Sequence, residues 1–102
     1  MTIVNAVAIH PISGEVWDDL QKQLKKVIDI VNKHGGENTT LFTTVIGGQE
    51  TNELTLLTSA PDWTRFGQVM EAVYGDPEMQ ALQVETAKIA SWEIRTAQTL
   101  EL

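Results

Sequence analysis

Polar side chains inside apolar stretches are the first candidates for chemistry. Asn5 is the single polar residue in the run Ile3-Val4-Asn5-Ala6-Val7. A buried amide needs a partner, so Asn5 either bonds to a neighbouring strand or loop, or orients a carbonyl or oxyanion of a ligand. His10 ends the first predicted strand, directly before Pro11. It could reach the mouth of a cleft as a general base, or it could be an ordinary histidine at a strand end.

Aromatic and methionine side chains recur at helical spacing in the middle of the chain. The residues that share one helix face are Trp63, Phe66, Met70, Val73 and Tyr74. This spacing is typical of ordinary core packing, but it also suits a pocket for a flat apolar ligand. The Tyr74 hydroxyl would add one polar contact to such a pocket. Trp92 could line the pocket or an interface, and its indole N–H then needs an acceptor.

Composition excludes several other kinds of chemistry. The 102-residue chain has no cysteine, which excludes disulfides, thiolate catalysis and cysteine-ligated metals. Its two histidines, His10 and His34, lack metal-ligand spacing, so we expect no metal site. We expect no cofactor either. His34 is interpreted as a cation at a helix end, where it complements the helix dipole. A net charge of −7 disfavours nucleic acid and anionic lipid.

Hydropathy points to a protein outside the membrane. No apolar run approaches the roughly 20 residues of a membrane span. The first residues lack a basic region followed by an apolar block, so no secretory signal is expected. We therefore expect a soluble, cytoplasmic protein that binds neither membranes nor nucleic acid.

The strands that would carry the candidate residues follow from alternation and composition. Thr2–His10 has two largely apolar faces, which favours a central strand. Asn38–Ile46 is rich in threonine, valine and aromatic residues, and Glu53–Ser59 is also predicted as a strand. A glycine-led turn at Gly47–Asn52 would join these two into a hairpin. Ser91–Leu100 alternates again and forms the last predicted strand, with Trp92 on one of its faces.

Helix signals separate these strands. Ser13 is a plausible N-cap for a first helix, and Gly35 a left-handed C-cap. The apolar face of that helix comprises Leu20, Leu24, Val27, Ile28 and Val31. A second helix begins near Trp63, and Asp76 with Pro77 ends it and starts a third helix that reaches about Ala90. The third helix places Met79, Leu82, Thr86 and Ile89 on one side.

The order of these elements predicts the architecture. Strand, helix, strand, strand, helix pair and strand, within a single domain spanning residues 1–102, give a four-stranded antiparallel sheet with helices on one face. The other face keeps apolar residues that nothing in the chain would cover. Exposed apolar sheet of this extent usually marks an interface, so we expect a homodimer formed through the sheet face.

This order is accompanied by two short motifs at helix starts. Pro61-Asp62-Trp63 opens the second helix, and Gly75-Asp76-Pro77-Glu78-Met79-Gln80-Ala81-Leu82 opens the third. Together they resemble the dimeric α/β-barrel superfamily, in particular NIPSNAP-like proteins and the antibiotic-biosynthesis monooxygenase family. The resemblance implies an α+β, ferredoxin-like β-α-β-β-α-β subunit, paired sheet to sheet, with a cleft between sheet and helices. Members include cofactor-independent monooxygenases, heme-degrading enzymes, isomerases and proteins without known activity.

The functional residues of these relatives carry over only in part. Heme-degrading members use a first-strand asparagine, which Asn5 could match. Their tryptophan and histidine fall at Ala72 and Leu82 here, so the resemblance implies no axial iron ligand and disfavours heme degradation. Quinone-forming members resemble this chain at Trp63. Their strand asparagine and helix tyrosine correspond to Ser59 and Val69.

These observations favour a small-molecule-binding protein of monooxygenase-like architecture. The ligand is expected to be apolar or aromatic and to lie between sheet and helices. The alternative is a cofactor-independent monooxygenase or isomerase acting on an aromatic or polyketide-like substrate, with Asn5, His10 or Tyr74 as catalytic candidates. The predicted ligand-binding residues are Asn5, Trp63, Phe66, Met70, Tyr74, Leu82 and Trp92.

Overall fold

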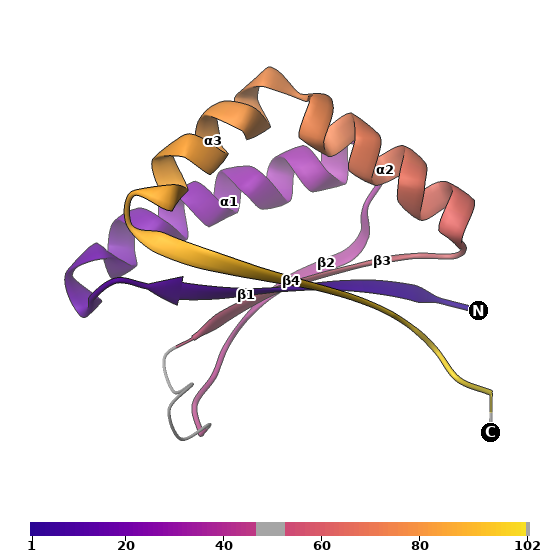
Figure 1. Ribbon diagram of the computed structural model, residues 1–102, viewed down its shortest axis with the longest axis horizontal. Coiled ribbons are helices and arrows are strands. Elements are labelled where there is room, and N and C mark those ends of the chain that lie inside the picture. Colours follow the sequence, from indigo (N-terminus) through magenta and orange to yellow (C-terminus); the bar gives the residue numbers. More distant parts are fainter. Residues whose placement is uncertain (47–52, 102) are drawn as a thin grey trace.

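The computed structural model describes residues 1–46 and 53–101, which form an antiparallel sheet with helices packed on one side (Figure 1). The elements, in chain order, are β1 (Ile3–Pro11), the 3₁₀ turn η1 (Gly14–Val16), α1 (Trp17–Lys33), β2 (Glu37–Thr43), β3 (Leu54–Ala60), α2 (Trp63–Gly75), α3 (Pro77–Ala87) and β4 (Ala90–Gln98). The four strands lie in the order β2-β3-β1-β4. This arrangement confirms the predicted ferredoxin-like fold, with its second helical region divided into α2 and α3. The turn predicted at 47–52 lies outside the described residues.

Strand β1 lies at the centre of the sheet and pairs with β3 on one side and β4 on the other, both antiparallel. Its residues alternate between the two sheet faces. The row that faces the helices is fully buried and comprises Ile3, Asn5, Val7 and Ile9. The row on the opposite face is only half-buried and comprises Val4, Ala6, Ala8 and His10. The described helices therefore cover one face of the sheet and leave the other open (Figure 1).

Helix α1 crosses the covered face and contributes the largest share of the core. Its buried residues are Leu20, Leu24, Val27, Ile30 and Val31. Ile28, which was predicted on this face, is half-buried at its edge, and Ile30 takes the buried place. Helix α3 buries Met79, Leu82 and Thr86 as predicted. It ends at Ala87 and not near Ala90, so Ile89, which was predicted on the same helix face, lies in the turn before β4 and is half-buried. The Thr86 hydroxyl donates a hydrogen bond of 2.8 Å to Gln23 Oε1 on α1, so this buried polar group is satisfied.

The buried face of α2 differs from the predicted aromatic one. Val69 and Val73 are its buried residues, whereas Trp63 is 48% exposed. Phe66, Met70 and Tyr74 are half-buried along the rim. Val69, which was not on the predicted face, lies beside Gly35 at the end of α1.

Helix α1 ends in two glycines with different roles. Gly35 has a φ of 96°, which confirms the predicted left-handed cap. Gly36 is constrained by space: a Cβ there would collide with Val31 Cγ1 and lie 3.0 Å from Thr58 Oγ1 on β3. The absence of a side chain at Gly36 thus allows the end of α1 to lie directly against the sheet.

Asp76 connects the end of α1 to the start of α3. Its carboxylate accepts hydrogen bonds from the Glu78 backbone N–H at 2.9 Å and from His34 Nε2 at 2.8 Å. Lys33 Nζ lies 3.4 Å away. These contacts confirm Asp76 as N-cap, with Pro77 in the first turn. The His34 hydrogen bond, followed by the Glu78 amide, lowers the pKa of Asp76 from 3.8 to about 2.

None of the helices formed by residues 1–46 and 53–101 has the length and apolar character needed to cross a membrane.

Two glycine substitutions test the close approach of α1 to the sheet. Gly36→Ala should lower the free energy of unfolding by about 1–3 kcal/mol, because the added methyl group overpacks the contact with Val31. Gly67→Ala is the matched control, since a Cβ at this exposed α2 position meets nothing within 4 Å. It should raise the free energy of unfolding by about 0.5–1 kcal/mol. Urea denaturation measures both, and equal effects would contradict this packing.

The low pKa of Asp76 predicts a specific acid sensitivity. Because the folded-state pKa lies below the unfolded value, the ionised carboxylate stabilises the fold above pH 3.8, and this contribution falls away as the pH drops toward about 2. Asp76→Asn retains a capping side chain but not the charge that pairs with His34 and Lys33. The variant should have a lower urea midpoint at neutral pH, and the difference from the parent should shrink between pH 4 and pH 2. A constant difference across this range would contradict the prediction.

Candidate functional site

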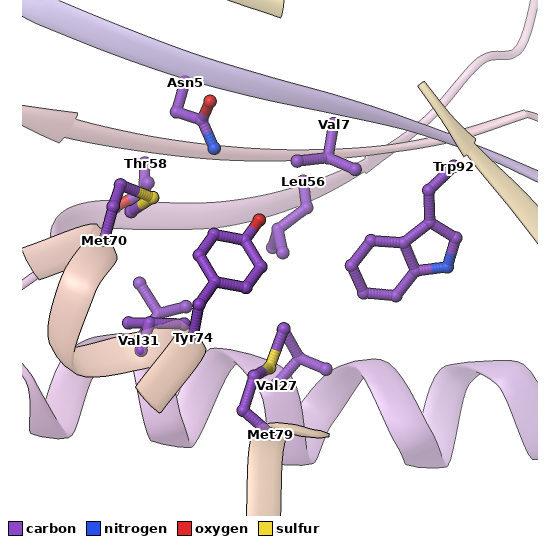
Figure 2. Close-up of a pocket in the computed structure, with 11 residues that line it drawn as sticks. Asn5, Val7, Val27, Val31, Leu56, Thr58, Met70, Tyr74, Met79 and Trp92 are labelled. Carbon is purple, nitrogen blue, oxygen red and sulfur yellow. The ribbon is translucent and has the colours of Figure 1, made fainter. Parts of the chain in front are cut away.

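A small cavity lies between the sheet and the three helices (Figure 2). Its volume is about 20 Å³, which is room for about one water molecule. Apolar side chains from β1, β3, β4 and all three helices form most of its wall. The polar side chains in the lining are Asn5, Thr58 and Tyr74. No charged side chain belongs to the described lining, so the interior is nearly apolar with a few fixed polar groups.

Asn5 projects into this cavity from the buried row of β1. It is 5% exposed, and its Oδ1 accepts a 3.1 Å hydrogen bond from Thr96 Oγ1 on β4. Its Nδ2 has no partner among the described residues and points toward the helices (Figure 2). The sequence left two alternatives for this amide, a bond to a neighbouring strand or a ligand contact. The oxygen makes the first kind of bond, and the nitrogen remains available for the second.

Tyr74 reaches the same cavity from the opposite side. Its ring extends from α2 and its hydroxyl points toward the sheet, in the direction of Asn5 and Val7 (Figure 2). The hydroxyl has no hydrogen-bond partner among the described residues. Burial raises the pKa of Tyr74 above its ordinary value of 10.0. The phenol is therefore neutral at physiological pH and offers a hydrogen-bond donor.

Thr58 completes the polar lining but is already satisfied. It lies opposite Asn5 in the β1–β3 register. Its hydroxyl donates to the Glu37 backbone oxygen at 3.2 Å and lies 3.1 Å from Thr39 Oγ1. The sequence analysis did not include Thr58 among the site residues. Strand register, which pairs Thr58 with Asn5, is the information that would have identified it.

The predicted ligand-binding residues are only partly assembled at this cavity. Asn5, Met70, Tyr74 and Trp92 line it together. Trp63, Phe66 and Leu82 are not part of the lining. Trp63 and Phe66 meet edge to face on α2, with their ring centroids 5.8 Å apart. The Trp63 Nε1–H donates a hydrogen bond of 3.0 Å to Gln98 Oε1 on β4. Leu82 is 7% exposed within the general core of α3.

His10 lies on the other face of the sheet. Its Nδ1 is 3.5 Å from Glu53 Oε2, and its Nε2 is 3.9 Å from Glu93 Oε2. Glu93 also accepts a 2.8 Å hydrogen bond from Arg95, which lowers the pKa of this glutamate. The sheet separates His10 from the cavity, so this imidazole does not act on a molecule bound beside Asn5. Within residues 1–46 and 53–101 no cluster of three or more acidic or histidine side chains is arranged to hold a metal ion.

The cavity can therefore recognise an uncharged molecule that carries an acceptor oxygen. Asn5 Nδ2 and the Tyr74 hydroxyl supply two donors, and the surrounding apolar wall strengthens hydrogen bonds by excluding water. Tyr74 is the only ionisable group in the described lining. With its pKa raised, the phenol does not serve as a general base at neutral pH.

Comparison with known proteins identifies the fold. Neither a protein-family model nor a curated protein matches the sequence. Among solved structures, SnoaB, a cofactor-independent oxygenase from Streptomyces nogalater, matches with a TM-score of 0.73 and 8% identity over 99% of this chain and 95% of its own. A NIPSNAP domain protein from Burkholderia xenovorans matches with a TM-score of 0.74 and 13% identity over 95% and 94% of the two chains. A NIPSNAP family protein from Agrobacterium tumefaciens gives 0.74 and 17% over 97% and 94%.

The chain thus has the ferredoxin-like subunit fold of the dimeric α/β-barrel proteins, over nearly its whole length. This confirms the resemblance to NIPSNAP-like and monooxygenase-like proteins as a likeness of fold. Sequence identities this low do not transfer an activity, and a shared fold hosts many functions.

The environment of Tyr74 can be measured directly because it is the only tyrosine in the chain. Its phenol should titrate, by ultraviolet absorbance, with a midpoint above 10.0 in the folded protein. The same protein in urea should titrate at the ordinary value, and Tyr74→Phe should show no phenol transition. A folded-state midpoint at or below 10.0 would contradict the buried position of the hydroxyl.

Proposed function

We propose that this protein binds a small, uncharged aromatic molecule with an acceptor oxygen, such as an aromatic ketone, in the cavity between its sheet and helices. The proposal rests above all on one observation: two hydrogen-bond donors, Asn5 Nδ2 and the Tyr74 hydroxyl, lie without partners in an otherwise apolar cavity. We also propose a cytoplasmic location, with which the absence of cysteine is compatible.

The character of the ligand follows from the lining. Asn5 Nδ2 and the Tyr74 hydroxyl both donate hydrogen bonds, so a ligand that meets them should carry an acceptor oxygen. An anionic ligand would find no counter-charge in the described lining and would be repelled by the net charge of −7. A flat aromatic ring matches the methionine, tyrosine and tryptophan side chains that form part of the wall.

The closed cavity must open to admit a ring. A cavity that binds benzene has a volume of about 150 Å³, several times the volume available here. Met70 and Tyr74 are both half-buried, and the unbranched Met70 side chain can move at low cost. Opening has to be driven by binding energy, so we expect modest affinity for a single ring.

The alternative function is a cofactor-independent oxygenase or isomerase for aromatic or polyketide-like substrates. The SnoaB-like fold is the observation that favours it. Asn5 and Tyr74 could polarise a substrate carbonyl and stabilise the resulting oxyanion. Such reactions also need a group that removes a proton, and the described lining offers no carboxylate or imidazole for this step. The geometry therefore supports binding more strongly than catalysis.

We further propose that the protein acts as a homodimer formed through the open face of the sheet. Small and apolar side chains occupy the centre of this face, including Val4, Ala6 and Ala8 on β1. Leu57 on β3 pairs with Ala6, and Phe42 on β2 is 49% exposed. None of the described helices lies over these residues (Figure 1). A second copy would remove this apolar surface from water.

Ligand binding can be tested with acetophenone, which combines one aromatic ring with one acceptor oxygen. Tyr74→Phe should weaken its binding about fivefold, because one hydrogen bond is lost while the ring remains. Met70→Trp should weaken binding more, because the larger indole side chain would fill space that the ligand needs. NMR titration of the full-length chain measures both affinities.

Trp63→Phe is the control for this experiment, since Trp63 lies outside the cavity lining. It should leave the affinity for acetophenone unchanged. Unchanged binding in both Tyr74→Phe and Met70→Trp would mean that the ligand site is elsewhere.

The dimer can be tested by placing positive charge on the open sheet face. The double variant Val4→Lys, Ala6→Lys should change the mass measured by light scattering from two chains to one, because lysines would be buried opposite each other. Val84→Lys is the control, since Val84 is 62% exposed on the outer surface of α3. A wild-type protein that is monomeric, or a double variant that remains dimeric, would contradict the proposal.

A further inference from the structure

A second hollow shares Trp92 with the cavity. It opens between α3 and β4 and has a volume of about 270 Å³, far larger than the interior cavity. Gln83 and Ala87 from α3 line it, together with Ala90, Ser91, Trp92 and Ile94 from β4. Trp92 belongs to the lining of both spaces. The indole is thus the shared wall between an opening to solvent and the closed space that contains Asn5 and Tyr74.

Little other than packing holds this wall in place. Trp92 is half-buried and comes from β4, which is an edge strand of the described sheet. Its six-membered ring lies toward Tyr74, with the indole nitrogen on the opposite side (Figure 2). The indole N–H has no hydrogen-bond partner among the described residues. A change of side-chain rotamer would therefore break no hydrogen bond with the described residues.

The two spaces have matching chemistry. As in the cavity, the described lining of the hollow contains no charged side chain, and its polar groups are those of Gln83 and Ser91. Ile94 is 53% exposed there, which leaves an apolar side chain at the mouth. A ligand that is uncharged, flat and longer than one ring would cover Ile94 while its far end reached the two inner donors.

We propose that the cavity and the α3–β4 hollow are two halves of one binding site, divided by the movable indole of Trp92, and that the ligand is a fused-ring aromatic molecule with an acceptor oxygen. This inference rests on the proposed function, since it adds to the same site an entrance and the number of rings in the ligand. The leading ring displaces the indole and brings its oxygen to Asn5 and Tyr74. The trailing ring lies against Ile94 and Ala87 in the hollow.

The size of the two spaces explains the preference for fused rings. One ring would fill the inner half alone and leave the hollow to water. A second ring would occupy the hollow and remove additional apolar surface from water, which stabilises the complex without another hydrogen bond. The pair acetophenone and 2-acetylnaphthalene isolates this effect, because both carry the same ketone and differ by one fused ring.

The decisive variants are Ile94→Asp, which places a charge in the hollow, and Trp92→Ala, which removes the dividing wall. Ile94→Asp should weaken 2-acetylnaphthalene about tenfold and acetophenone much less, because a charge beside the trailing ring must be desolvated. Val84→Asp is the matched control, an equally exposed change on α3 outside the hollow, and should alter neither affinity. Trp92→Ala should speed the association of both ketones about tenfold by removing the gate. Ile94→Asp keeps the test valid if Trp92→Ala does not fold.

The outcomes separate this inference from the proposed function. If both ketones bind in a Tyr74-dependent way but Ile94→Asp affects them equally or not at all, the two-part site is wrong and the proposed function stands. If neither ketone binds the wild-type chain, or if binding survives Tyr74→Phe and Met70→Trp unchanged, both are wrong. Selective loss of 2-acetylnaphthalene in Ile94→Asp, with faster association in Trp92→Ala where that variant folds, supports the two-part site.

Discussion

The structure depends on one constraint: the described helices cover a single face of a four-stranded sheet. Every second residue of β1 must therefore be compatible with a dry interior, and Ile3, Val7 and Ile9 satisfy this requirement. Asn5 does not, and a buried amide is retained only where its hydrogen-bonding groups find partners. Thr96 satisfies its oxygen, which leaves the nitrogen directed at the helices. The position of the candidate site follows from this single polar residue in the buried row.

The same constraint explains why a site can exist in so small a domain. At Gly36 the end of α1 comes close to Thr58 of β3, and the hydrogen bonds of Asp76 to His34 and Glu78 join the end of α1 to the start of α3. Between these fixed points, half-buried side chains such as Met70 and Trp92 form the walls. Asn5 and Tyr74 face this space from the sheet and from α2, so the two donors are oriented before a ligand binds. Orientation in advance reduces the entropy lost on binding.

Much of this fold could be predicted from the sequence because its signals are local. Alternation identified β1 as a central strand, and the capping roles of Gly35 and Asp76 follow from residue type alone. The buried face of α2 could not be predicted in this way. Helical spacing marks an apolar face, but it did not mark Val69, which lies beside Gly35 at the end of α1.

The site was predictable to a similar extent. The polarity of Asn5 and the helical position of Tyr74 marked them in advance. Helical spacing did not reveal that Trp63 lies outside the cavity lining, where it bonds to Gln98 from a distant part of the chain. His10 illustrates the same limit. The alternation of side chains along β1 places His10 on the open face of the sheet. Its contacts with Glu93 on β4 and with Glu53 beside β3 depend on how the strands pair, which the sequence does not give.

The central claim is that the unpaired donors of Asn5 and Tyr74 receive the oxygen of an aromatic ligand between the sheet and the helices. A crystal structure of the full-length protein with 2-acetylnaphthalene tests this most directly. We expect the ketone oxygen within hydrogen-bond distance of Asn5 Nδ2 and the Tyr74 hydroxyl, with the Trp92 side chain displaced from the position it has here. A ligand bound on the open sheet face or elsewhere on the surface, with both donors still unoccupied, would contradict it.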